Sequence, residues 1–171
     1  MNQYRVTKYN PEFRNAEGVY TKDEWTSFSE VGKTVSKGEY AEVEAAYIDT
    51  AIQFFEEQGI AGLAIVYLEN SAGYKDPKMK LAEGEIVHKD NLASVIRGIL
   101  RENYWAKLES KNAYLHFGWD FYMYIGVPLA ASQAITVAER NGLFVEEFES
   151  PYLSELYQRL ARDRGKKRHC P

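Results

Sequence analysis

The sequence predicts a single α+β domain in which three to four helices pack on a mixed, mainly antiparallel sheet. Strand-like runs and long amphipathic stretches both occur, but they do not alternate strictly as they would in a doubly wound fold. With 171 residues and 45% hydrophobic content, the chain is long enough to bury one core. We expect this domain over residues 1–160, followed by a mobile basic tail over residues 161–171.

The helices are predicted from apolar residues that recur with the 3.6-residue period. Ser36 or Gly38 opens the first helix, and Gly59 fits its C-terminal stop. Asp90 is the expected cap of the second helix, and Asn141-Gly142 ends the third. The predicted helices cover about residues 39–58, 91–109 and 129–140, and a fourth begins at Ser150-Pro151 and ends near residue 164.

The strands are predicted from β-branched and aromatic runs at residues 4–8, 63–68, 83–88, 113–117, 121–127 and 143–148. The run over residues 63–68 is apolar throughout, which predicts a central strand buried on both faces. The fourth and fifth strands flank Gly118-Trp119-Asp120 and predict an antiparallel hairpin, although one long bulged strand also fits. Thr21 and Glu24 match a capping box, followed by one helical turn or an ordered loop.

The expected compartment is the cytoplasm. No stretch approaches the roughly 20 apolar residues of a membrane helix, and the first five residues lack the apolar region of a secretory signal. The only cysteine, Cys170, cannot form an internal disulfide.

Charge is unevenly distributed along the chain, whose formal net charge is −4. The segment from Arg159 to the last residue contains six basic residues and one acid. The preceding residues therefore carry 15 basic and 24 acidic side chains, a net of −9. An acidic body repels nucleic acid and attracts basic partners. The alternative is that the charge serves only solubility.

No known catalytic or cofactor motif is present. His88, His116 and His169 lie far apart without metal-ligand spacing, and the apolar pattern around His116 favours a structural role. Gly32-Lys33-Thr34 resembles the end of a phosphate-binding loop but lacks its upstream glycine, and no GxSxG elbow exists. We therefore expect neither an enzyme nor a bound metal or cofactor.

Clustered carboxylates leave a hydrolase open as an alternative. The most notable group is Glu146, Glu147 and Glu149. In a strand, Glu147 and Glu149 share one face, whereas Glu146 shares the other with phenylalanines. A charged sheet edge or a binding rim is the interpretation we favour.

Aromatic residues favour a protein partner over nucleic acid. The six aromatics of residues 114–124 are accompanied by Asp120 and by no lysine or arginine, so no nucleic-acid site is expected there. The basic tail leaves a nucleic-acid-associated regulator as a further alternative. Each tryptophan below could instead cap a small core. The candidate partner-binding residues are Trp119, Asp120 and Tyr122, the glutamates Glu146, Glu147 and Glu149, and a second patch of Asp23, Glu24 and Trp25.

Four stretches carry a resemblance to a known class of protein: Tyr4–Arg14, Tyr20–Lys33, His116–Ile125 and Gly142–Pro151. Together they resemble small bacterial immunity proteins of polymorphic or contact-dependent toxin systems. The resemblance implies a cytoplasmic protein that binds and neutralises one cognate toxin domain. Such toxins are often basic nucleases, which an acidic, aromatic-bearing domain would suit. It transfers no functional residue.

Overall fold

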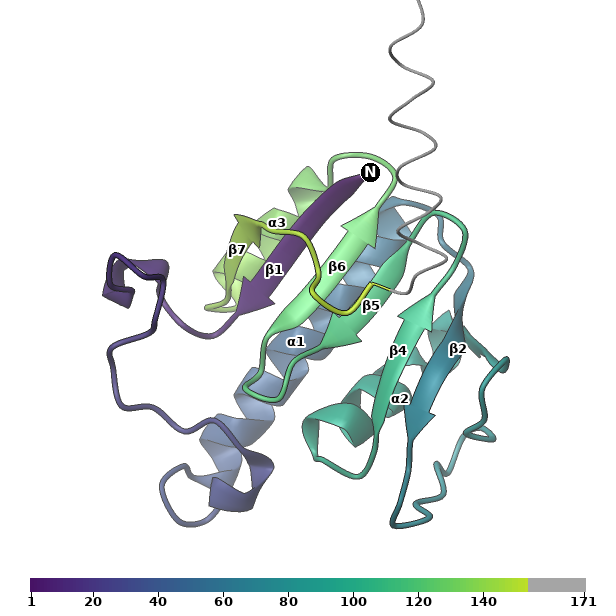
Figure 1. The fold of residues 1–171 in the computed structure, drawn as a ribbon, viewed down its shortest axis with the longest axis horizontal. Helices are drawn as coiled ribbons and strands as arrows, with labels where there is room; N and C mark the ends of the chain where they lie inside the picture. Colours follow the sequence, from purple (N-terminus) through teal and green to yellow (C-terminus); the bar gives the residue numbers. More distant parts are fainter. Residues whose placement is uncertain (154–171) are drawn as a thin grey trace, which may run out of the picture.

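The computed structural model describes residues 1–153 and shows an α+β fold with one seven-stranded sheet (Figure 1). Its helices are α1 (Lys37–Glu57), α2 (Lys89–Leu100) and α3 (Ser132–Arg140). Its strands are β1 (Asn2–Thr7), β2 (Gly62–Glu69), β3 (Ile86–His88), β4 (Trp105–Glu109), β5 (Tyr114–Phe117), β6 (Met123–Val127) and β7 (Phe144–Glu147). Within the described residues, every helix is too short or too polar to cross a bilayer.

The sheet has the strand order β3-β2-β4-β5-β6-β1-β7, and all of its described pairings are antiparallel. Figure 1 shows α1, α2 and α3 together on one face of the sheet, here called the helix face. Alternate strand residues such as Val6, Ile125 and Leu115 point into the core between this face and the helices. The opposite face, here called the second face, is crossed by the segment that follows β7.

Helix α1 is the central helix of the core. The Ser36 hydroxyl accepts a hydrogen bond from the Glu39 amide at 3.1 Å and caps its first turn. Gly59, with φ of +64°, follows its last turn, as expected for a C-terminal stop. The buried Glu44 carboxylate ties α1 to α2 through ion pairs to Arg97 at 2.9 Å and Arg101 at 2.6 Å.

The predicted helix over residues 91–109 is wrong in its second half, because α2 ends at Leu100 and residues 105–109 form β4. The helix ends in a Schellman motif: the Glu102 amide donates to the Ile99 carbonyl, and the Asn103 amide donates to the Gly98 carbonyl. Glu102 takes the left-handed position with φ of 58°. Because glycine normally occupies that position, the stop has no signal in the sequence.

Three further expectations need correction. Strand β2 is not buried on both faces along its length, because Val66 and Tyr67 are 40% and 42% exposed at an irregularity in its pairing with β4, and β3 pairs with its first three residues alone. No capping box forms at Thr21 and Glu24. The box forms instead at Ser27 and Glu30, where a 3-10 turn over Phe28–Glu30 follows. His88, and not Asp90, is the N-cap residue of α2.

The second face carries its own small core, because β5 and β6 also bury large side chains there. Tyr114 and Tyr124 pack with Leu153, which follows β7 in the chain. The Tyr114 ring lies directly against Gly126, where a side chain of any size would overlap it. Most of the helix predicted from Ser150-Pro151 to residue 164, and the whole basic tail over 161–171, lie beyond Leu153, outside the described residues.

Candidate protein-binding site

The turn between β5 and β6 holds Trp119 in an exposed position. The Gly118 amide donates to the Tyr122 carbonyl at 2.7 Å and closes the turn. Phe121, with φ of 58°, turns its ring into the core against Trp25, and its carbonyl accepts a hydrogen bond from the Tyr47 hydroxyl. The turn is thus anchored from inside, while the Trp119 side chain is 66% exposed.

Trp119 stacks on Trp105 of β4, with ring centroids 6.3 Å apart and an interplanar angle of 14°. Trp105 is itself fixed, because its indole N–H donates to the Phe117 carbonyl at 2.7 Å. Its ring also contacts Tyr67 and Tyr152, both with centroids at 5.5 Å. Trp119 therefore extends an ordered aromatic cluster and is not an isolated side chain on a loop.

A cleft of about 210 Å³ lies beside the two tryptophans. It is lined by residues from the end of β2, the α2–β4 turn and the β5–β6 turn: Glu69, Ser71, Ala72, Ile99, Leu100, Glu102, Asn103, Tyr104, Trp105, Phe117, Gly118, Trp119 and Phe121. The lining contains two carboxylates and, among the residues described, no lysine or arginine. Most of the lining side chains are apolar or aromatic, and the two charged ones are negative.

The cleft is also where the backbone is least relaxed. Among residues 1–153, Glu102 and Phe121 are the two non-glycine residues with positive φ, and both line the cleft. This conformation places the Cβ atom close to the following carbonyl and costs roughly 1–2 kcal/mol per residue. Strained positions of this kind concentrate at functional sites, which supports the cleft as a binding site.

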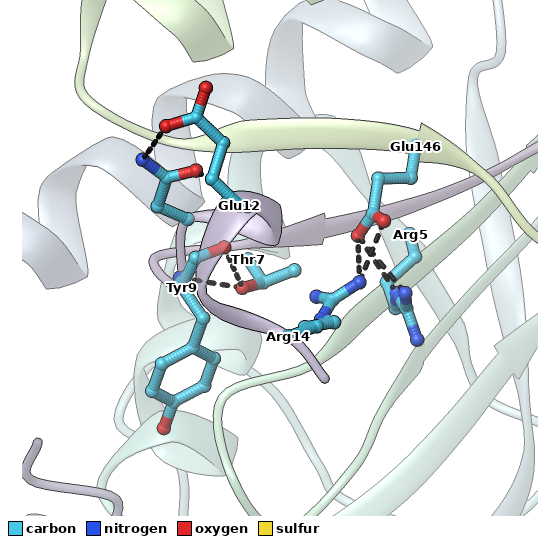
Figure 2. Close-up of polar contacts among 7 residues, drawn as sticks. Arg5, Thr7, Tyr9, Glu12, Arg14 and Glu146 are labelled. Carbon is cyan, nitrogen blue, oxygen red and sulfur yellow. Dashed lines mark hydrogen bonds and ion pairs between the residues drawn. The ribbon is translucent and has the colours of Figure 1, made fainter. Parts of the chain in front are cut away.

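Glu146 belongs to an internal ion cluster. Figure 2 shows the guanidinium groups of Arg5 and Arg14 directed at its one carboxylate, with closest distances of 3.0 Å and 2.6 Å. The Arg14 side chain is 9% exposed, and its Nε and Nη2 atoms have no hydrogen-bond partner among the described residues. The Arg5 guanidinium also lies 4.2 Å from the Phe148 ring centroid. Glu146 therefore neutralises two largely buried guanidinium groups, and its charge is already paired although its side chain is 25% exposed.

The other predicted residues near β7 and the β5–β6 turn differ in their accessibility. Glu147, Glu149 and Asp120 are exposed. Glu147 and Glu149 line a separate hollow of about 300 Å³ beside the first four residues of the chain, and they do not line the Trp119 cleft. Tyr122 is half-buried between Tyr9 and the Arg5 guanidinium, which links it to the Glu146 cluster.

In the second predicted patch, Asp23 and Glu24 are exposed and Trp25 is buried. Trp25 is 9% exposed and packs in the core, so its ring is not a surface anchor. The Lys8 ammonium lies 4.2 Å from that ring centroid and forms an ion pair with Glu24 at 3.0 Å. Burial lowers the pKa of Lys8, and the Glu24 carboxylate opposes this shift. Asp23 is exposed, so it remains a surface charge beside an internal tryptophan.

A buried hydrogen-bonded series of Ser150, His116 and Glu109 lies on the second face. His116 Nδ1 is 2.8 Å from the Ser150 hydroxyl, and Nε2 is 3.1 Å from the Glu109 carboxylate. These residue types also form nucleophilic triads. Here the three residues are at most 5% exposed, so a substrate has no access to Ser150 Oγ in this conformation. The series holds the segment after β7 against β5 and β4, a structural role for His116.

Sequence reasoning missed Trp105, Glu69 and Glu102, which complete the cleft around Trp119. The helical spacing of the apolar residues in α2 continues as far as Trp105. The strand alternation of Trp105 with Ala106 therefore cannot be recognised in the sequence. Among residues 1–153, no three His, Cys, Asp or Glu side chains are grouped so that they could hold a metal ion.

No family model, curated protein or solved structure matches this chain.

Proposed function

We propose that this protein is a bacterial immunity protein that neutralises one basic toxin domain by forming a stoichiometric complex with it. The observation that carries the proposal is the exposed Trp119, stacked on Trp105 at the edge of an acidic cleft. Tryptophan is enriched among the few residues that dominate binding energy at protein interfaces. A ring held on an anchored turn also loses little conformational freedom on binding.

The charge distribution supports a basic partner. The residues before Arg159 carry a net charge of −9, and the cleft presents two carboxylates beside its aromatic wall. An acidic surface raises the association rate with a basic protein and disfavours acidic partners. A nuclease domain, which must bind phosphate, is a basic partner of this kind.

The resemblance to immunity proteins involves segments that form one structural unit. Arg5 of the first stretch pairs with Glu146 of the fourth, and Lys8 pairs with Glu24 of the second. The second and third stretches meet where Trp25 contacts Phe121. The third and fourth meet through the hydrogen bond between His116 and Ser150. These contacts support the view that the four similar stretches belong to one shared structural unit. That unit includes the turn that carries Trp119.

The test is capture followed by functional rescue. The tagged full chain is used as bait in a lysate of the native host, and each captured protein is then expressed alone in a sensitive strain. We expect one basic partner that is captured near one to one, is lost at high salt and arrests growth. Co-expression of this chain should restore growth only when it is at least equimolar with the partner, because a stoichiometric inhibitor does not turn over.

Trp119→Ala is the matched site variant, and Leu129→Ala is its control because Leu129 is similarly exposed (70%) and does not line the cleft. Trp119→Ala should lose rescue, and Leu129→Ala should retain it. Captured proteins that are harmless when expressed alone would contradict the immunity function. Rescue at clearly substoichiometric levels would point instead to an enzyme.

A further inference from the structure

The walls of the Trp119 cleft match the parts of an arginine side chain, an inference that rests on the proposed function. Ile99, Leu100 and Phe117 are among the apolar lining residues against which an aliphatic stem can pack. The Trp105 and Trp119 rings, inclined by only 14° to each other with centroids 6.3 Å apart, both line the cleft. A planar cation stacks favourably on the face of an indole ring.

The carboxylates of the cleft come from separate elements. Glu69 ends β2, and Glu102 occupies the α2–β4 turn. One Glu102 oxygen accepts a hydrogen bond from the Phe28 amide at 2.8 Å, and the other has no partner among residues 1–153. The left-handed backbone of Glu102 holds this side chain at the cleft. The described lining of the cleft therefore holds two carboxylates and no cation, while Lys107 lies outside it with its ammonium group 5.9 Å from the Trp105 ring centroid.

We propose that the cleft receives an arginine side chain of the basic partner, with its guanidinium group stacked on the tryptophan pair and paired with Glu102 or Glu69. Arginine is preferred to lysine for three reasons. Its guanidinium group is planar, it is more weakly hydrated than an ammonium group, and it presents several donors to carboxylates while it stacks on a ring. A lysine ammonium group would gain the charge interaction and lose the stacking.

The experiment is a titration of the full chain with small blocked amino acids, followed by ¹H–¹⁵N spectra of its three tryptophan indoles. The probes are N-acetyl-arginine amide, N-acetyl-lysine amide and N-acetyl-citrulline amide, the last a neutral isostere of arginine. We expect saturable shifts of the Trp105 and Trp119 signals with the arginine probe, while the buried Trp25 signal stays in place. The lysine and citrulline probes should bind at least about threefold more weakly.

Variants test the assignment of each wall. Trp119→Ala should weaken the arginine probe about tenfold. Glu102→Gln, which keeps an oxygen for the Phe28 amide, and Glu69→Gln should each weaken it about threefold. Glu139→Gln is the matched control, since Glu139 is exposed outside the cleft, and it should change nothing. The remaining amide spectrum reports whether each variant is folded.

Absence of saturable Trp119 shifts, or equal affinity for arginine, lysine and citrulline, would overturn the arginine assignment. The proposed function fails by a different readout. If the probe does not bind but growth rescue still depends on Trp119, the immunity function stands and the arginine pocket falls. If the probe binds with the expected selectivity but no captured protein is toxic, the pocket stands and its partner is not a toxin.

Discussion

Arg14 and Glu146 form a close ion pair across 132 residues of chain: Arg14 Nη1 lies 2.6 Å and 2.7 Å from the two carboxylate oxygens of Glu146. Arg5 donates to the same carboxylate from Nε at 3.2 Å and from Nη2 at 3.0 Å. One carboxylate thus serves two largely buried guanidinium groups. The pair joins the loop after β1 to β7. Glu146 therefore has a structural role.

Replacing Glu146 with glutamine should destabilise the protein by about 2–3 kcal/mol, because two neighbouring cations would lose their counter-charge. The estimate is below that for a fully buried pair, since the Glu146 side chain is 25% exposed. Urea unfolding measures the change. Glu147→Gln, at an exposed neighbouring position, should stay within about 0.5 kcal/mol of the parent. Equal unfolding midpoints for the two variants would show that the arginines do not depend on Glu146.

Alanine substitutions of the two tryptophans predicted as anchors should differ clearly in their effect on the free energy of unfolding. Trp25→Ala removes a core ring and should cost about 3–5 kcal/mol. Trp119→Ala removes a ring that is 66% exposed, and should cost about 1 kcal/mol or less through its lost stacking on Trp105. Thermal unfolding followed by circular dichroism compares them. A large loss for Trp119→Ala would mean that its ring is structural, which would contradict its assignment as a binding residue.

Two glycines in helices should respond in opposite directions to alanine. At Gly98 in α2, an added Cβ would lie 2.5 Å from a carbon of the buried Tyr104 ring, so Gly98→Ala should cost about 1–3 kcal/mol through overpacking. At Gly38 in the first turn of α1, no atom lies within 4 Å of that position. Gly38→Ala should stabilise by up to about 1 kcal/mol. The melting temperature of Gly98→Ala should therefore fall and that of Gly38→Ala should rise. A higher melting temperature for Gly98→Ala would refute the close packing of Tyr104 against Gly98.

The stability of the protein should fall in mildly acidic solution because of His116. Burial lowers the pKa of His116 below its ordinary value of 6.5, and Glu109 opposes this shift through its hydrogen bond and charge, while Lys107 adds to it. Between the lowered folded value and 6.5, the unfolded chain binds more protons than the folded one. The free energy of unfolding should therefore be flat above about pH 7 and decrease as the pH falls through this window.

Urea midpoints at about pH 7.5, 6.5 and 5.5 measure this dependence, and His116→Gln provides the comparison because glutamine is polar but does not titrate. The variant should be less stable than the parent chain at the highest pH and lose less on acidification. If the stability of His116→Gln fell with pH as steeply as that of the parent chain, the pH dependence would belong to other titratable groups.

The elements that could be predicted are those whose ends carry a local signal. Helices α1 and α3 end in Schellman motifs with glycine in the left-handed position, at Gly59 and Gly142, and the sequence predicts both stops. The hairpin around Trp119 is confirmed by the pairing of β5 with β6. Helix α2 ends in the same motif with Glu102 in place of glycine, so nothing in the local sequence marks the boundary.

The candidate site could be predicted only in part for a related reason. Trp119 stands at a predicted turn between two strands, where a large ring is difficult to bury, but the sequence left open that it caps a small core, and only the structure shows that it is 66% exposed. Trp105 and Glu69 come from adjacent strands β4 and β2, and Glu102 from the turn that precedes β4. Because the periodicity hides β4, no sequence argument could place these residues beside Trp119.

The sequence by itself determined the α+β class, most of the strands and helices, the acidic body and the aromatic turn, because periodicity, glycine stops and charge are local properties. Tertiary structure alone decided which charged and aromatic residues remain accessible. Trp25 and Trp119 were equal candidates in the sequence, but Trp25 is buried in the core and Trp119 is exposed. Strand alternation separates the faces of Glu146 and Glu147, but only the structure shows that Glu146 is paired with Arg5 and Arg14. Exposure and pairing depend on side chains that are distant in the sequence, so they are set only when the sheet is assembled.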